Sequence, residues 1–150
     1  MSLEQEVELI RQFRIFSKID PAMQKLLCFG SERLTYDPGQ SLVRLGDAAD
    51  AAYVIIEGTV EVSVDSPKGP LVISTSGANE IIGEIGIFGD VPRTATVTAT
   101  SRVEALKISK ELFINIIRQN PEAAIEVLRV LATRLANTTR QLTQTVAGTK

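Results

Sequence analysis

The spacing of apolar residues changes twice along the chain and divides it into a helical, an extended and a second helical part. The first stretch, residues 3–16, has apolar residues at helical intervals, at Leu3, Val7, Ile10, Phe13 and Phe16. Asp20 followed by Pro21 is typical of a helix start, because Asp caps the free N–H groups and Pro fits the first turn. We therefore expect a second short helix to about Cys28 and a helical segment over residues 1–29.

Between residues 30 and 108 the spacing becomes two, which predicts β-strands. Residues 53–56 and 59–64 read as a hairpin around Glu57-Gly58, with alternate valines on the second strand. Turns are expected at 36–39 and 66–70, and further strands at 71–75, 93–99 and 103–108. Short strands at regular intervals predict a mainly β fold with flanking helices: a sandwich, jelly roll or barrel.

The last part predicts two helices over residues 109–143 and a flexible tail over 144–150. Ser109 caps the first of these helices, and Asn120-Pro121 opens the second. In the second helix, steps of four and three residues join Ala124, Leu128, Leu131, Leu135, Thr138 and Leu142. This heptad spacing favours a homodimer through residues 121–143. For the first half of the helix, packing on the chain's own barrel explains the stripe equally well.

The composition of the chain excludes several classes of function. The chain has 150 residues, the size of a single domain, and its net charge of -2 gives no electrostatic basis for direct nucleic-acid binding. No apolar run reaches the ~20 residues that cross a bilayer, so we expect a cytoplasmic protein without membrane insertion. One cysteine and no histidine exclude an internal disulfide, a Ser-His or Cys-His pair and a His-ligated metal. We expect no catalytic residues, no metal and no enzyme activity.

The segment 81–97, IIGEIGIFGDVPRTATV, carries the most specific chemistry. Glu84 and Arg93 are its charged residues inside an apolar, glycine-rich setting, where unpaired charges are rarely buried. The glycines allow a short helix over 84–88, whose N-terminus suits an anion, and close approach of another group to Gly83 and Gly86. Arg93 matches two phosphate oxygens, whereas Glu84 suits a neutral hydroxyl. From spacing alone, a Glu84–Arg93 salt bridge is an equally good explanation.

A family resemblance separates the two explanations. Gly83-Glu84-Ile85-Gly86 and Pro92-Arg93-Thr94-Ala95-Thr96-Val97 closely resemble the phosphate-binding cassette of the cyclic-nucleotide-binding domain family. The resemblance covers roughly residues 10–142 and includes 37–39, 46–47 and 53–62 in the expected order. It implies an eight-stranded antiparallel jelly-roll barrel over residues 30–108, with N-terminal helices and a C-terminal lid or dimer helix.

The resemblance also implies roles for individual residues. Arg93 would pair with the cyclic phosphate of cAMP or cGMP, and Glu84 would accept from the ribose 2′-hydroxyl. The implied ligand-binding set is Gly83, Glu84, Ile85, Gly86, Arg93, Thr94, Ala95, Thr138 and Thr139, in which the backbone N–H groups of Glu84, Ile85 or both would also serve the ligand. Thr94 would add a hydroxyl near the phosphate; the alternative is that it is simply a strand residue. Thr138 and Thr139 resemble hydroxyls that reach the adenine in catabolite-activator-type proteins, one from the partner subunit, or they are exposed polar residues.

The expected function is thus a cyclic-nucleotide sensor whose final helix moves over the ligand as a lid. The alternatives are a dimerisation or docking module with a vestigial pocket, and the sensor half of a transcription regulator whose DNA-binding domain or other effector lies elsewhere. Asn79 stands where the family often has glycine, but Asn tolerates a left-handed backbone. Cys28 and Phe88 are expected in the core.

Overall fold

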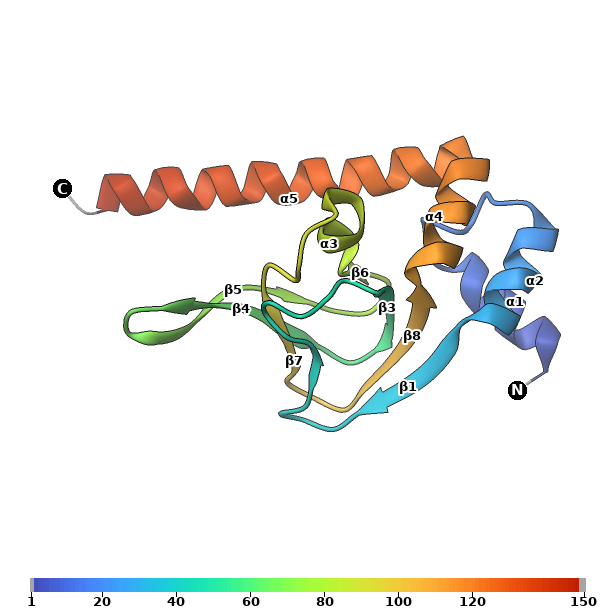
Figure 1. Cartoon of the computed structure of the whole chain (residues 1–150), viewed down its shortest axis with the longest axis horizontal. Helices are drawn as coiled ribbons and strands as arrows, with labels where there is room; N and C mark the ends of the chain where they lie inside the picture. Colours follow the sequence, from blue (N-terminus) through green and yellow to red (C-terminus); the bar gives the residue numbers. More distant parts are fainter. Residues whose placement is uncertain (1, 149–150) are drawn as a thin grey trace.

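The computed structural model describes residues 2–148 and shows a two-sheet β-structure flanked by helices (Figure 1). Its strands are β1 (Glu32–Tyr36), β2 (Ser41–Val43), β3 (Ala51–Glu57), β4 (Val60–Ser66), β5 (Gly69–Ser76), β6 (Ile81–Ile82), β7 (Thr96–Ala99) and β8 (Val103–Ser109). Its helices are α1 (Leu3–Arg11), α2 (Pro21–Gly30), α3 (Glu84–Gly89), α4 (Lys110–Gln119) and α5 (Pro121–Gly148).

The strands form two four-stranded sheets with the orders β1-β8-β3-β6 and β2-β7-β4-β5, and every pairing is antiparallel. This arrangement confirms the predicted eight-stranded, jelly-roll-like structure with N-terminal helices and a long C-terminal helix. One group of buried side chains fills the space between the sheets, and a second lies between the first sheet and the helices. The elements that carry the candidate site, β3, β6, α3 and α5, lie around this second group.

The predicted hairpin at Glu57-Gly58 is wrong, because β3 and β4 belong to different sheets. The chain turns a corner here at Gly58, whose φ is 98°. A Cβ at Gly58 would lie 2.3 Å from the carbonyl oxygen of Arg102, so the two sheets meet closely at this corner. The actual hairpin is β4–β5, around the turn expected at 66–70. Alternation of apolar residues shows which side chains face a core, but it does not identify the neighbouring strand.

The first helix is shorter than its apolar stripe predicts. It ends at Arg11. The backbone that follows makes tighter turns with three-residue hydrogen bonds, in which Phe13 N donates to the Ile10 carbonyl and Phe16 N to the Phe13 carbonyl. Both phenylalanines are still buried, as predicted, in the core beneath the helices. The buried Gln24 amide donates to the Phe16 carbonyl at 3.3 Å and thereby ties this irregular segment to α2. The predicted caps Asp20 and Ser109 are both present.

Helix α5 lies across α3 and continues past the barrel, above the projecting β4–β5 hairpin (Figure 1). The helix runs to Gly148, beyond the boundary expected at residue 143, and residues 149–150 of the predicted tail lie outside the described residues. Asn120 does not cap α5 with its side chain as predicted. Its side-chain amide instead donates to the Ile116 carbonyl at 2.8 Å and closes α4.

The exposed face of α5 shares Leu128, Leu135 and Leu142 with the predicted heptad line, and its other members lie one position later. Ala123, Val127 and Val130 pack on the core of the same chain. Of the predicted line, Ala124 and Leu131 are half-buried against the domain. The fully exposed line has the same four- and three-residue spacing and consists of Ile125, Leu128, Ala132, Leu135, Thr139 and Leu142. Packing on the chain's own domain is therefore observed for the inner face, whereas the homodimer stays a prediction, now for the exposed line.

Among the described residues, no helix is both long enough and apolar enough to cross a lipid bilayer.

Candidate functional site: the cassette between β6 and α5

Helix α3 is short because left-handed residues bound it on both sides. Gly83, at its N-cap, has a φ of 91°, and Asp90, at its C-cap, has a φ of 51°. Gly83 contributes no side-chain cap, so the N–H groups of the first turn of α3 have no capping side chain there. A Cβ at Gly86 would lie 2.5 Å from the Cβ of Ala49, which explains the glycine within the helix. The predicted cassette helix over 84–88 is thus present, one residue longer.

Arg93 is buried, with 5% of its surface exposed, and lies at the end of the site next to β3. Its Nη1 donates to the Gly83 carbonyl at 2.9 Å, and its Nη2 donates to the Ala51 carbonyl at 2.6 Å. The guanidinium lies over the ring of Tyr53, 5.9 Å from the centroid. Asp50 is the carboxylate that pairs with Arg93, with Oδ1 3.7 Å from Nη2. Backbone carbonyls, rather than a buried countercharge, therefore hold Arg93.

Gly83 and Arg93 are in such close contact that a side chain at residue 83 would have to displace the guanidinium. A Cβ there would lie 2.4 Å from Nη1 of Arg93 and 3.2 Å from the carbonyl oxygen of Ala51. The positive φ is a second reason for glycine at this position. The start of α3 is therefore fixed directly on the guanidinium.

Glu84 is fully buried, with 0% of its surface exposed, at the other end of the site. Its Oε1 accepts from Nη1 of Arg134, and Nη2 of Arg134 donates to the Ile81 carbonyl. The second oxygen, Oε2, is buried without a hydrogen-bond partner among the described residues. A carboxylate oxygen in this state has unused capacity to accept a hydrogen bond, which is costly unless a donor arrives.

The Glu84–Arg93 salt bridge that spacing alone allowed is not among the ion pairs of the described residues. Each of the two charges has its own partners, Arg134 for Glu84 and the carbonyls of β3 and β6–α3 for Arg93. The two charged side chains therefore remain separate groups at the two ends of one cassette.

The structure brings Gly83, Glu84, Gly86 and Arg93 of the predicted set together. Of the others, Thr94 is exposed and Ala95 is half-buried in the segment that precedes β7. The N–H of Ile85 belongs to the first turn of α3, while the side chain of Ile85 lies outside the described residues.

Thr138 and Thr139 are exposed residues of α5. Thr138 follows Arg134 by four residues, so the two side chains lie on the same face of the helix, one turn apart. Thr139 belongs to the exposed heptad line instead. Within one chain, the two hydroxyls therefore point in different directions around the helix.

Three smaller predictions have different outcomes. Asn79 has a φ of 70°, the left-handed backbone expected of it. Cys28 is half-buried against the core beneath the helices, and burial raises the pKa of its thiol. Phe88 is not a core residue, because 41% of its surface is exposed, although its ring lies 5.6 Å from that of the buried Phe113 in α4.

Arg134 is the site residue that the sequence analysis missed. The sequence pattern that could have identified it is the inward stripe of α5. Ala123, Val127 and Val130 are followed by Arg134, at steps of four, three and four residues. A cation at the end of an apolar stripe needs a buried partner. Glu84 is that partner, 50 residues away along the chain.

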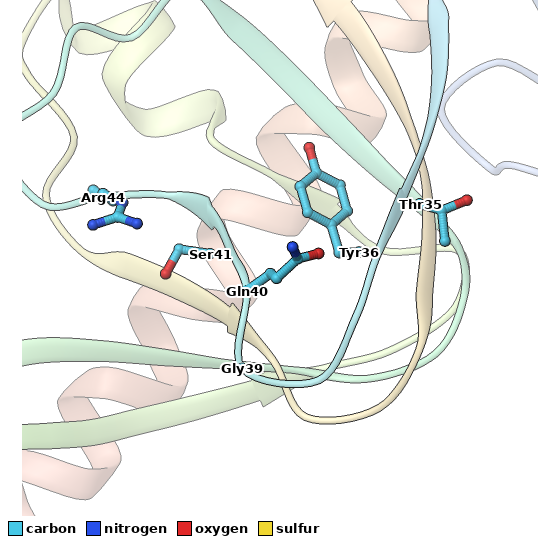
Figure 2. A pocket seen from close by; sticks show the side chains of 6 residues that line it. All are labelled: Thr35, Tyr36, Gly39, Gln40, Ser41 and Arg44. Carbon is cyan, nitrogen blue, oxygen red and sulfur yellow. The ribbon is translucent and has the colours of Figure 1, made fainter.

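A polar hollow of about 480 Å³ lies elsewhere, at the turn between β1 and β2 (Figure 2). Figure 2 shows Tyr36, Gln40 and Ser41 beside the hollow, with Arg44 at its other end. Burial, the largest cause, raises the pKa of Tyr36 to about 12. None of the lining residues belongs to the predicted set, and Arg44 is exposed. The buried charges of the cassette make it the better candidate for a ligand site.

Comparisons with known proteins agree with this geometry. The family model described as "Cyclic nucleotide-binding domain" matches residues 33–120. The chain therefore belongs to the cyclic nucleotide-binding domain family, and it has the form of a regulatory domain of that family.

The chain is similar to a CRP-like cAMP-activated global transcriptional regulator of Mycobacterium tuberculosis, with 28% identity over 90% of this chain and 61% of that protein. It thus spans less than two thirds of that relative. Its fold is similar to the sensor domain of the transcriptional regulator DNR from Pseudomonas aeruginosa, with a TM-score of 0.78 and 23% identity over 92% of this chain and 93% of the other. It is also similar in fold to the regulatory subunit of a cAMP-independent protein kinase A from Trypanosoma brucei (TM-score 0.76, 20% identity, 87% and 47% covered).

Proposed function

We propose that this domain senses a cyclic nucleotide, cAMP or cGMP, held between Arg93 and Glu84, and that binding changes how α5 is held. The ring phosphate lies at Arg93 and the N-terminus of α3, and the ribose 2′-hydroxyl donates to Glu84. The resemblance of the cassette and the membership of the family support these roles.

The observation that carries the proposal is the buried Oε2 of Glu84, which has no hydrogen-bond partner among the described residues. An unsatisfied buried acceptor costs about 1–3 kcal/mol. A ribose hydroxyl supplies the donor without requiring Glu84 to release Arg134 from Oε1. Glu84 thus has one oxygen for the helix and one for a ligand.

The donors of Arg93 suit the other end of such a ligand. A guanidinium has five N–H groups. Two of them donate to the carbonyls of Gly83 and Ala51, which fixes the plane of the group. The others are available to phosphate oxygens, and a charge-assisted contact to an already oriented guanidinium loses little side-chain entropy.

Arg134 links the ligand to α5. Its guanidinium contacts both Glu84 and the Ile81 carbonyl, so the position of α5 depends on the same carboxylate that would accept from the ribose. A hydroxyl that donates to Oε2 draws on the same carboxylate charge and changes the orientation of Glu84, and therefore the strength of the Arg134 contact. The ligand response is then a shift between two ways of holding α5.

A second copy of this chain is the proposed partner, through the exposed heptad line of α5. Leu128, Leu135 and Leu142 are 64%, 68% and 67% exposed on this line. A stripe that repeats every seven residues is self-complementary, so two copies can pair along it. In such a dimer Thr138 stays beside its own cassette, whereas Thr139 faces the partner, and the two hydroxyls reach the bases of different subunits.

A docking module with a vestigial pocket is the second candidate, favoured by the exposed leucines and by the fold likeness to a cAMP-independent kinase subunit. The sensor half of a transcription regulator is a special case of the first proposal, and the similarity to the mycobacterial regulator favours it. Nucleotide binding separates the vestigial module from the sensor.

The first experiment measures thermal unfolding of wild type, Arg93→Ala and Arg44→Ala with excess cAMP and then cGMP. At ~100 times Kd, a ligand of the native state adds ~2.7 kcal/mol and raises Tm by several degrees. Arg93→Ala should weaken binding by roughly 10- to 150-fold, or 1.5–3 kcal/mol. Arg44, an exposed arginine of the β1–β2 hollow, is the matched control and should respond like wild type.

The relative rise with cAMP and cGMP ranks the two nucleotides. No rise with either would contradict a sensor and favour the docking module. For Glu84, the sharper test compares cAMP with its 2′-deoxy analogue. Glu84→Gln should weaken cAMP and leave the analogue almost unchanged, and equal losses would contradict the ribose role.

A further inference from the structure

The phosphate end of the site contains a carboxylate that nothing so far has used. Asp50, directly before β3, places Oδ1 3.7 Å from Nη2 of Arg93. Its side chain is 71% exposed, whereas that of Arg93 is 4% exposed. Asp50 therefore lies at the solvent side of the guanidinium, on the side from which an anion in solution would approach.

The net charge of the site can be counted separately at its two ends. Glu84 and Arg134 are an ion pair of zero net charge at the ribose end. Arg93 and Asp50 also sum to zero at the phosphate end. An approaching phosphate therefore gains directed hydrogen bonds from Arg93 but little net long-range attraction. Each additional negative charge on the ligand is attracted by Arg93 and repelled by Asp50, so Asp50 cancels much of the advantage that a doubly charged ligand would otherwise gain from Arg93.

We propose that Asp50 makes the phosphate end selective for singly charged phosphodiesters over doubly charged phosphomonoesters. A cyclic nucleotide carries one charge on its phosphate, whereas a 5′-nucleotide carries about -1.5 to -2 at pH 7. Asp50 thus rejects linear nucleotides by charge rather than by shape. This inference rests on the proposed function of the same site.

Electrostatics gives the proposal a quantitative form. Because the repulsion is proportional to ligand charge, removing it should help a dianion by about the square of the factor by which it helps a monoanion. An exposed charge contributes little, so Asp50→Asn should tighten a phosphodiester by about 2- to 5-fold. A phosphomonoester should then tighten by about 4- to 25-fold. Both factors should shrink at high ionic strength.

The experiment measures Kd by calorimetry for three ligands: cAMP, 5′-AMP and the methyl ester of 5′-AMP. The methyl ester is linear like 5′-AMP but singly charged like cAMP, so it separates charge from ring shape. The proteins are wild type, Asp50→Asn and Asp37→Asn, each at about 50 mM and about 500 mM salt. Asp37 is an exposed carboxylate of the β1–β2 turn, and its substitution makes the same change in net charge far from Arg93.

The expected result is a selective gain for 5′-AMP in Asp50→Asn at low salt, with a smaller, equal gain for cAMP and the methyl ester, and no change in Asp37→Asn. Equal factors for all three ligands, or no change, while cAMP binds wild type would overturn the inference and leave the proposed function standing. Failure of every protein to bind any of the three would overturn both.

Discussion

The two ends of the cassette are built in different ways. At one end, neighbouring backbone carbonyls and the glycine at the start of α3 hold Arg93 inside the barrel. At the other end, Glu84 is oriented by Arg134, a residue of the last helix, 50 positions farther along the chain. The phosphate end is therefore complete once the barrel has folded, whereas the ribose end also needs α5 in place.

This difference separates affinity from signalling. A ligand contact with Arg93 does not act directly on α5, because its hydrogen-bond and ion-pair partners in the described part of the chain, Gly83, Ala51 and Asp50, all lie outside that helix. A ligand contact with Glu84 acts on a group that α5 shares. We therefore expect substitutions at the phosphate end to change mainly binding, and substitutions at the ribose end to change mainly the helix.

The largest expected effect breaks the ribose end. Arg134→Ala leaves Glu84 buried without a countercharge, which costs about 3–5 kcal/mol in a buried pair. Partial exposure of Arg134 places the loss at the lower end of that range. Denaturant unfolding measures it, and hydrogen exchange should show loss of protection in α5 with β3 and β7 unaffected.

Arg129→Ala is the matched control on the same helix, because Arg129 is exposed and its ion pair with Glu126 is local. It should cost at most about 1 kcal/mol. Adding Glu84→Gln to Arg134→Ala removes the buried charge and should recover part of the loss. Equal losses for the two arginine variants would contradict the contrast between the ends.

The next effect concerns the outer face of α5. Leu135→Asp places a charge in the middle of the exposed heptad line and should weaken self-association by about 2 kcal/mol or more, roughly 30-fold. The monomer should be almost unaffected, because 68% of the surface of Leu135 is exposed and it belongs to neither group of buried side chains. Sedimentation over a range of concentrations measures both species, and an unchanged dimer, or no dimer in wild type, would reject the proposed seam.

The third expected effect concerns the phosphate end and leaves every charged residue in place. Gly83→Ala combines a left-handed φ of 91° with a Cβ 2.4 Å from Nη1 of Arg93, and we expect a loss of about 1–3 kcal/mol. Gly69→Ala is the control, because its φ is 104° but a Cβ there meets nothing within 4 Å. The excess loss at Gly83 measures the contact with Arg93. Equal losses at the two glycines would mean that Arg93 moves aside freely.

The smallest expected effect concerns the ion pair between Arg33 and Glu104, which serves as a reference for the charged residues at the two ends of the cassette. Nη2 of Arg33 donates to Glu104 at 2.8 Å and, opposed by burial, holds the pKa of Glu104 below its ordinary value of 4.5. A lowered folded-state pKa adds stability above about 4.5, and this stability is lost as pH falls through the folded value. Glu104→Gln should cost about 0.2–1 kcal/mol at pH 7 and less at pH 3. Urea unfolding at the two pH values measures it, and a larger cost at pH 3 would contradict the pKa direction.

Sequence patterns predicted the fold well wherever the relevant spacing was local. Asp20 and Ser109 cap their helices, and the period-two stretches became strands, because these features depend on residues a few positions apart. Strand pairing across the Gly58 corner could not be predicted this way. Burial of Val60 is equally consistent with a hairpin to β3 and with the observed pairing to β5 and β7.

The candidate site shows the same limit. Gly83, Glu84, Gly86 and Arg93 lie within one segment, so their proximity followed from the sequence. The position of Arg134 beside Glu84 did not follow from the sequence, because it depends on which face of α5 turns inward. The predicted heptad line shares its three outer leucines with the exposed line but includes Ala124 and Leu131, which are half-buried, because these residues are apolar as well. Only the packed helix distinguishes an inward line from an outward one.

The continuation of α5 beyond Arg134 makes this helix a lever. At about 1.5 Å of rise per residue, the part from Arg134 to Gly148 measures roughly 21 Å. A tilt of about 10° around the Arg134 contact therefore moves the far end by about 4 Å. If ligand binding rotates α5 about the contact of Arg134 with Glu84, a small rotation there is a displacement the size of a side chain at the tip of the helix.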